Sequence, residues 1–226
     1  MTSRLVVRVG RGTTVVRISR SPWGFPDRVY QHPDGTFGCR WDDPAGDYRV
    51  AYMARTAVGA YLEALAGFRR DPAIDAFAFE PDPGGRDIPS IPAGMVPREW
   101  IATRRRLEGR LHGRFLRVTA TGSMGVLRRV AASVEVGTGV RLDTAAMRAV
   151  EPRAFTQGIG RVVFDLPAGL DGIAYSSRHG DDEECVAAFE RRPLDVMVTD
   201  REDQPIHHDD ADLLTALDLL HLGLES

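Results

Sequence analysis

Three short segments of the chain each place one polar side chain among small and apolar residues. They carry Arg40, Glu63 and Ser177, in that order along the sequence. The planar guanidinium of an arginine can bind two phosphate oxygens at once. A positioned carboxylate stabilises positive charge that develops during a reaction, and a hydroxyl donates a hydrogen bond. The three side chains are therefore candidates for a site that binds a phosphate-bearing ligand and acts on it electrostatically.

Glu63 lies in a segment, residues 56–70, whose apolar positions recur at the spacing of a helix. The apolar stripe consists of Ala57, Ala60, Tyr61, Ala64, Leu65 and Phe68. Glu63 lies away from this stripe, and its neighbours one turn away are glycines and alanines. These small neighbours leave free volume that a ligand could occupy. An ordinary exposed helix glutamate is the alternative, and the spacing alone favours it.

The other candidates also have structural explanations. Arg40 could bridge to Asp42 or Asp43 instead of to a ligand. Tyr52, on an expected strand that precedes the helix, could be half-buried with its hydroxyl satisfied locally. Ser177 has no histidine or lysine at a recognisable spacing, so the sequence does not indicate a nucleophilic serine.

The composition fits one sizeable domain, which we expect to span residues 1–226. Hydrophobic residues make up 43% of the chain and charged residues 27%, enough for a core and a hydrated surface. The net charge is −3, from 29 basic and 32 acidic side chains, which argues against nucleic-acid binding. We expect the arginine run at residues 104–106 to be a solvated helix face.

The chain has two cysteines, Cys39 and Cys185, so no disulfide framework is expected. Neither has cysteine or histidine neighbours at the spacing of a zinc site, and we expect no metal. No apolar stretch is long enough for a signal peptide or a membrane-spanning helix. The sequence predicts a cytoplasmic protein with no membrane partner.

Strands and helices alternate irregularly along the chain, which favours an α+β fold over regular βαβ repeats. Strands are expected at residues 5–9, 13–18, 49–53, 114–118, 173–176, 185–189 and 196–199. Helices are expected at residues 56–70, from 97, from 123 to 130, near 147, at 155–164 and at 210–222. Ser123 and Asp143 are the expected caps of two of these helices. Residues 71–113 are rich in proline and glycine and read as an irregular insertion.

The three segments, in this order, resemble the signature of the RES domain family, which is named for its arginine, glutamate and serine. The resemblance spans residues from about 15 to about 190, and Tyr52 precedes Glu63 by the family's spacing. It implies an ADP-ribosyltransferase-like fold, with a split, mostly antiparallel sheet flanked by helices around an NAD cleft. It also implies an enzyme that destroys NAD and acts as the toxin of a toxin–antitoxin pair.

The resemblance assigns roles to individual side chains. Arg40 would bind the pyrophosphate of NAD, and Arg17, on the preceding strand, would be a second phosphate ligand. Tyr52 would stack on the nicotinamide or bond to the ribose. Glu63 would hold the ribose and stabilise the oxocarbenium-like state. Ser177 would donate to the carboxamide or a phosphate, and NAD is thus a substrate, with no further cofactor.

Three positions depart from the family's common pattern. Ser176 stands where the family often has proline, so either Ser176 or Ser177 could be the functional serine. Cys39 replaces a common glycine and Asp42 a common asparagine.

Several functions remain compatible with this resemblance. The leading one is an NAD glycohydrolase or phosphorylase with a cognate antitoxin protein as its partner. The alternatives are an ADP-ribosyltransferase that modifies a macromolecule and a non-catalytic nucleotide-binding protein of the same fold. The sequence leaves both a monomer and a homo-oligomer open.

Overall fold

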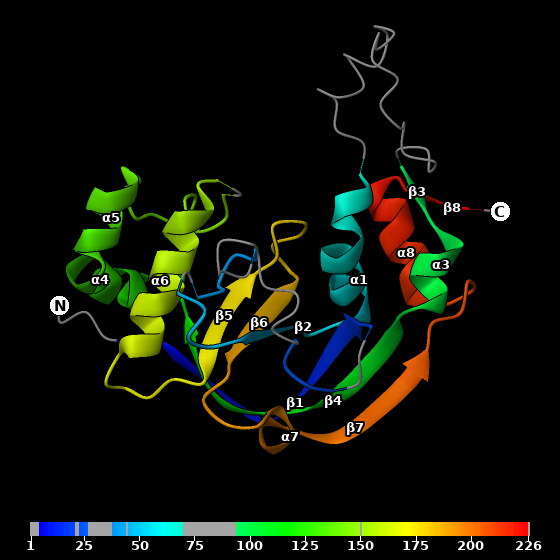
Figure 1. Cartoon of the computed structure of the whole chain (residues 1–226), viewed down its shortest axis with the longest axis horizontal. Helices are drawn as coiled ribbons and strands as arrows, with labels where there is room; N and C mark the ends of the chain where they lie inside the picture. Colours follow the sequence, from blue (N-terminus) through cyan, green and yellow to red (C-terminus); the bar gives the residue numbers. More distant parts are fainter. Residues whose placement is uncertain are drawn as a thin grey trace, which may run out of the picture.

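A computed structural model describes residues 5–20, 23–26, 38–43, 45–69, 94–149 and 151–225 of the chain. Helices and strands are mixed in it, as the sequence predicts, with a sheet between two groups of helices (Figure 1). Within the described ranges, no helix has the length and apolar character needed to cross a membrane.

Six strands form the main sheet in the order β1-β2-β6-β5-β4-β7. Their bounds are Val7–Ser19 (β1), Val50–Ala54 (β2), Arg105–Arg117 (β4), Gly172–Ser176 (β5), Glu184–Phe189 (β6) and Val198–Pro205 (β7). β4 and β5 are parallel, and the other pairs of neighbouring strands are antiparallel. A separate parallel pair joins β3 (Met95–Val96) to β8 (Gly223–Leu224).

The main sheet closes on itself, because β1 pairs with β4 as well as with β2. Strands β1, β2, β6, β5 and β4 therefore form a closed ring, and β7 pairs with β4 outside it. The expectation of a split antiparallel sheet is wrong. The physical reason is the length of β1 and β4, which have 13 residues each. One edge of β4 pairs with β1 along this length, and its other edge is long enough to pair with both β7 and β5.

Side chains on β2, β5 and β6 alternate between two faces, as strand geometry requires. One face joins a core cluster with α7 (Leu194–Met197), and includes Ala51, Met53, Ala174, Val186 and Ala188. The other face joins a larger cluster, and includes Val50, Ala54, Ile173, Tyr175, Cys185, Ala187 and Phe189. Burial on both faces holds these three short strands in register.

Two groups of helices stand on either side of β2, β5 and β6 (Figure 1). The first group is α4 (Thr121–Val130), α5 (Ala132–Thr138) and α6 (Arg153–Asp165), whose apolar side chains join the larger cluster. The second group is α1 (Ala57–Leu65), its 3-10 extension η2 (Ala66–Phe68), α3 (Arg98–Ala102) and α8 (Ala211–Leu220), which share a third cluster.

A polar network fixes α1 against α8 and the sheet. The Tyr61 hydroxyl donates to Asp210 Oδ2 (3.0 Å), and Asp210 also caps α8. Arg106 Nη1, on β4, lies 3.2 Å from Asp210 Oδ2 and 2.7 Å from Asp212 Oδ2. Since charged hydrogen bonds are the stronger kind, this network sets where the rest of α1 lies.

Several elements differ from their predicted bounds. The two expected N-terminal strands are one strand, β1, whose register shifts between Arg11 and Thr13 around Gly12 (φ +73°). Residues 105 and 106 open β4 rather than forming a helix face, because β1 and β7 pair with them. Within the range expected to be an irregular insertion, residues 94–113 contain β3, α3 and the start of β4, and α3 begins one residue after the expected helix start at 97. Residues 70–93 lie outside the described residues.

Two expected caps and one expected strand are also corrected. Ser123 lies inside α4, and its buried hydroxyl accepts a hydrogen bond from the Val6 N–H (3.0 Å) instead of capping. Asp143 accepts from the Ala146 N–H (2.7 Å) in a turn rather than opening a helix. Val196 belongs to α7, since the strand begins at Val198.

Gly172 on β5 generates a prediction about the ring. A Cβ at this position would overlap the carbonyl oxygen of Ala187 on β6, which cannot move without breaking the strand pair. We expect Gly172→Ala to lower the free energy of unfolding by about 1–3 kcal/mol, the usual cost of overpacking. Urea denaturation measures this. The control is Gly137→Ala on α5, where an added Cβ meets nothing within 4 Å. Equal stability of the two variants would contradict close pairing of β5 and β6.

Candidate functional site

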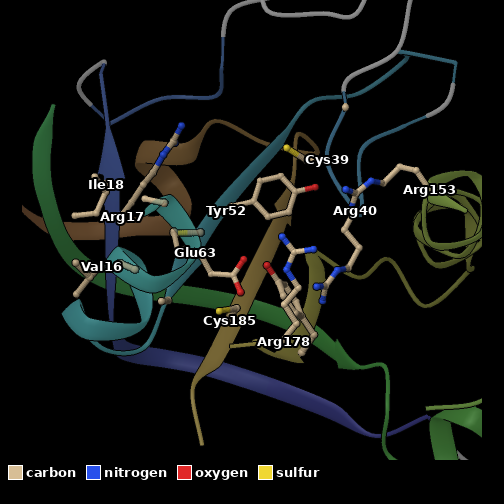
Figure 2. A pocket seen from close by; sticks show the side chains of 16 residues that line it. Val16, Arg17, Ile18, Cys39, Arg40, Tyr52, Glu63, Arg153, Arg178 and Cys185 are labelled. Atoms are coloured by element: carbon tan, nitrogen blue, oxygen red, sulfur yellow. The ribbon is translucent and has the colours of Figure 1, made fainter. Parts of the chain in front are cut away.

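A cavity of about 310 Å³ is lined by residues of β1, β2, β5, β6 and α1, by the first residue of α6 and by part of the 38–43 segment. Its lining includes Arg17, Arg40, Tyr52 and Glu63, four of the side chains selected from the sequence (Figure 2). They come from β1, the 38–43 segment, β2 and α1. The fold thus brings together residues that are far apart in the chain.

Ser177 joins this group through Glu63. Its hydroxyl donates to Glu63 Oε1 (2.6 Å) and accepts from the His179 N–H (3.0 Å). Ser177 follows the last residue of β5 and is fully buried, whereas Ser176 pairs with Glu184 on β6 and is half-buried. The structure therefore brings Ser177 to the carboxylate. The His179 N–H is itself a donor and the Glu63 oxygen an acceptor, so the single hydroxyl proton of Ser177 is directed to Glu63.

Arg40 is buried, with 7% of its surface exposed. Its guanidinium lies over the rings of Tyr175 (5.2 Å to the centroid) and Trp41 (6.0 Å). Nη1 is buried and has no hydrogen-bond partner among the described residues. A buried donor without a partner costs free energy, and this cost disappears when an anion binds there.

The structural alternative for Arg40 was an ion pair with Asp42 or Asp43. The Asp42 carboxylate instead accepts from the Tyr52 hydroxyl (2.8 Å), and the Asp43 carboxylate faces Arg161 Nη1 (3.4 Å). Among the described residues, Arg40 forms no ion pair with either. Arg40 is thus available to a ligand in the cavity.

Tyr52 has its hydroxyl satisfied by the protein. It donates to Asp42 Oδ1 (2.8 Å) and accepts from the Trp41 N–H (2.9 Å). Burial raises the pKa of Tyr52 well above its usual value, so the phenol stays protonated. The Tyr52 hydroxyl thus has hydrogen-bond partners within the protein, which the sequence analysis gave as the alternative to a role in ligand binding. The ring, rather than the hydroxyl, is the part of Tyr52 that is free to meet a ligand.

Three further basic side chains line the cavity, and two of them were missed from the sequence. Arg17 donates through Nη1 to the carbonyl of Gly24 (2.5 Å), and burial lowers its pKa to about 10, so it remains a cation at neutral pH. Arg153 opens α6 and Arg178 directly follows Ser177. The sequence feature that could have identified them is their position, since one stands at a helix start and the other next to a candidate serine. Spacing alone did not show that both face Arg40.

The described part of the lining holds four arginines and one acidic residue, Glu63. Figure 2 shows Arg40, Arg153 and Arg178 on one side of Glu63, and Arg17 on the other. This charge favours a polyanionic ligand. Burial raises the pKa of the Cys185 thiol, which also lines the cavity, so this thiol stays protonated and is a poor nucleophile.

No group of three or more histidine, cysteine or acidic side chains is placed to hold a metal ion within the described ranges. The described side chains gathered at the site include one carboxylate, one buried hydroxyl and four guanidinium groups.

Comparison with known proteins assigns the chain to a family. The family model described as the RES domain matches residues 14–209. The chain belongs to the RES domain family. The match includes Arg17, Arg40, Tyr52, Glu63 and Ser177, so every candidate in this RES domain lies within the shared region.

The solved structures that resemble this RES domain include a crystal structure of the MbcT–MbcA toxin–antitoxin complex from M. tuberculosis. The TM-score is 0.49 at 14% sequence identity, and the alignment covers 94% of this chain and 91% of that one. The sequence comparison with curated proteins finds no match.

The unpartnered guanidinium generates a prediction about anion binding. We expect Arg40→Lys to weaken binding of inorganic pyrophosphate by roughly tenfold or more, because an ammonium keeps the charge and loses the bidentate geometry. Titration calorimetry measures the affinity. Arg129→Lys, at an exposed position on α4, is the control and should bind like the parent. Unchanged affinity with a lower melting temperature would make Arg40 a structural residue.

Proposed function

We propose that this RES domain binds NAD and cleaves the glycosidic bond between its nicotinamide and ribose. One observation carries the proposal: Glu63, held by Ser177 at 2.6 Å, shares a cavity with a buried arginine whose Nη1 has no partner among the described residues. A carboxylate beside a cationic anion-binding surface fits a substrate that has a pyrophosphate and develops positive charge on a sugar.

The arginines would bind the pyrophosphate. Arg40 is buried and its guanidinium lies over the ring of Tyr175, which restricts where it can meet a ligand. Arg153 and Arg178 lie on the same side of the cavity, so two phosphate groups could each meet a guanidinium (Figure 2). Arg17 would contribute from the opposite side. The ring of Tyr52 would provide a flat surface for the nicotinamide.

Glu63 would act on the ribose. Breaking the bond to the pyridinium nitrogen gives an oxocarbenium-like state, in which positive charge develops on the sugar. A carboxylate that is already positioned stabilises this charge without reorganising during the reaction. The hydrogen bond from Ser177 to Oε1 would hold the carboxylate, and Oε2 would face the substrate. Ser177 thus supports Glu63 rather than attacking the sugar itself.

Nicotinamide is the leaving group, and the acceptor decides the product. Attack by water gives ADP-ribose, and attack by inorganic phosphate gives ADP-ribose 1-phosphate. Transfer to a protein would give a labelled macromolecule, and a binding protein would leave NAD intact. Incubating the purified protein with NAD, with and without phosphate, separates these outcomes. In this proposal NAD is the substrate and no metal or further cofactor takes part.

Family membership supports a cellular role. We propose that the protein works in the cytoplasm as the toxin of a toxin–antitoxin pair, where it meets the cell's NAD directly. A cognate antitoxin protein would then be required, since a chain that consumes NAD harms the cell that makes it.

The role of Glu63 gives a direct test. We expect Glu63→Gln to fold normally and to lower NAD turnover by about 10²- to 10³-fold, because the charge is lost while the shape is kept. Release of nicotinamide, measured by chromatography, reports the rate. Glu99→Gln, an exposed helix glutamate on α3, is the matched control. If Glu63→Gln keeps more than half of the parent's turnover, Glu63 has no part in the reaction.

Expression in a bacterial host tests the toxin role. We expect the wild-type chain, induced alone, to stop growth as cellular NAD falls, and the Glu63→Gln variant to be tolerated. Both forms are induced in parallel, and growth, cellular NAD and soluble protein are measured. Normal growth with unchanged NAD, despite abundant soluble wild-type protein, would contradict the toxin role.

A further inference from the structure

The loop that joins β5 to β6 carries Ser177 at its start and Glu183 at its end. The Ser177 N–H donates to the Glu183 carbonyl (2.7 Å), and the Glu183 N–H donates to the Gly180 carbonyl (3.2 Å). These bonds close the loop at its base. Arg178, which lines the cavity, lies on the same loop. The placement of this loop therefore decides where Ser177 and Arg178 lie relative to α1.

The Glu183 side chain reaches the first turn of α1. Thr56 caps this helix by accepting a hydrogen bond from the Gly59 N–H (2.9 Å). The same Thr56 hydroxyl donates to Glu183 Oε2. The first turn of α1 contains no acidic residue of its own. Glu183 thus supplies, from a distant segment, the negative charge that stabilises the N-terminus of a helix.

Gly59 makes this approach possible. A Cβ at this position would overlap Glu183 Oε2 and would come within 3.0 Å of the Thr56 hydroxyl oxygen. Gly59 lies in a helix, where alanine is the better helix former. The absence of a side chain therefore costs helix propensity, and it leaves the space that the Glu183 carboxylate occupies.

We propose that Glu183, Thr56 and Gly59 form a clamp that holds the β5–β6 loop on α1 and so positions Ser177 against Glu63. Glu63 lies one turn beyond Gly59 on the same helix. The loop and the helix are thus joined at two points, Thr56–Glu183 and Glu63–Ser177. One contact alone would set a distance between two segments, whereas two also set their relative rotation.

The clamp rests on the proposed function, because its effect is on the proposed catalytic carboxylate. Glu183 is a positioning residue, since it acts through Ser177 and does not line the cavity. Of the three arginines proposed to bind the pyrophosphate on one side of the cavity, Arg178 lies on the clamped loop. Arg40 and Arg153 come from the 38–43 segment and from α6, so the clamp does not hold these two. Releasing it should therefore lower kcat more than it weakens NAD binding.

Gly59→Ala is the main test. We expect kcat for NAD cleavage to fall about 10- to 100-fold, the cost of a small misplacement of a reacting group, with KM within about threefold of the parent. The melting temperature should change little, because the better helix propensity of alanine offsets the displaced contact. The matched control is Gly137→Ala on α5, where an added Cβ meets nothing within 4 Å, and its kcat should be unchanged.

Variants of Glu183 separate positioning from folding. Glu183→Ala should lower kcat as Gly59→Ala does, and Glu183→Gln should restore most of it, because the amide oxygen still accepts from Thr56. The double variant Gly59→Ala/Glu183→Ala should be no slower than either single variant, since the overlap is then gone.

The outcomes distinguish the clamp from the proposed function. An active wild type with Gly59→Ala or Glu183→Ala at the parent's kcat overturns the clamp alone. Fully additive losses in the double variant also overturn it. A wild type that leaves NAD unchanged overturns the proposed function and, with it, the clamp's part in catalysis.

Discussion

The hydrogen bond between Ser177 and Glu63 depends on the whole architecture, because the two residues lie 114 positions apart in the chain. Ser177 takes its place from the end of β5, which β4 and β6 hold from both sides. Glu63 takes its place from α1, which packs on α8 and is tied to Asp210 through Tyr61. A shift of either support by an ångström would separate a 2.6 Å contact, so closure of the ring and packing of the helices both serve this one interaction.

Burial of Arg40 is the second constraint, and it costs free energy rather than stabilising the fold. The fold places a guanidinium where Nη1 lacks a partner among the described residues, at a cost of about 1–3 kcal/mol for such a donor. Stacking on Tyr175 offsets part of this cost. The site is thus arranged before a ligand arrives, and an anion that binds there recovers the remainder.

Sequence patterns predicted elements well where local spacing decides them. The expected helices at 155–164 and 210–222 match α6 and α8 within two residues at each end, and the strand at 185–189 matches β6 within one. The predictions were wrong where pairing between distant segments decides where a strand begins or ends. β4 begins nine residues before the expected strand because β1 and β7 offer partners there, and the arginine run at its start has no local strand signal.

The sequence by itself determined which side chains could do the chemistry, their order, and the helix on which Glu63 stands clear of the apolar stripe. The tertiary structure decided which of them meet. It joined Ser177 rather than Ser176 to Glu63, satisfied the Tyr52 hydroxyl with Asp42, and added Arg153 and Arg178 to the cavity. The reason is physical: propensity and periodicity act over a few residues, whereas these contacts depend on how strands far apart in the chain pair and close the ring.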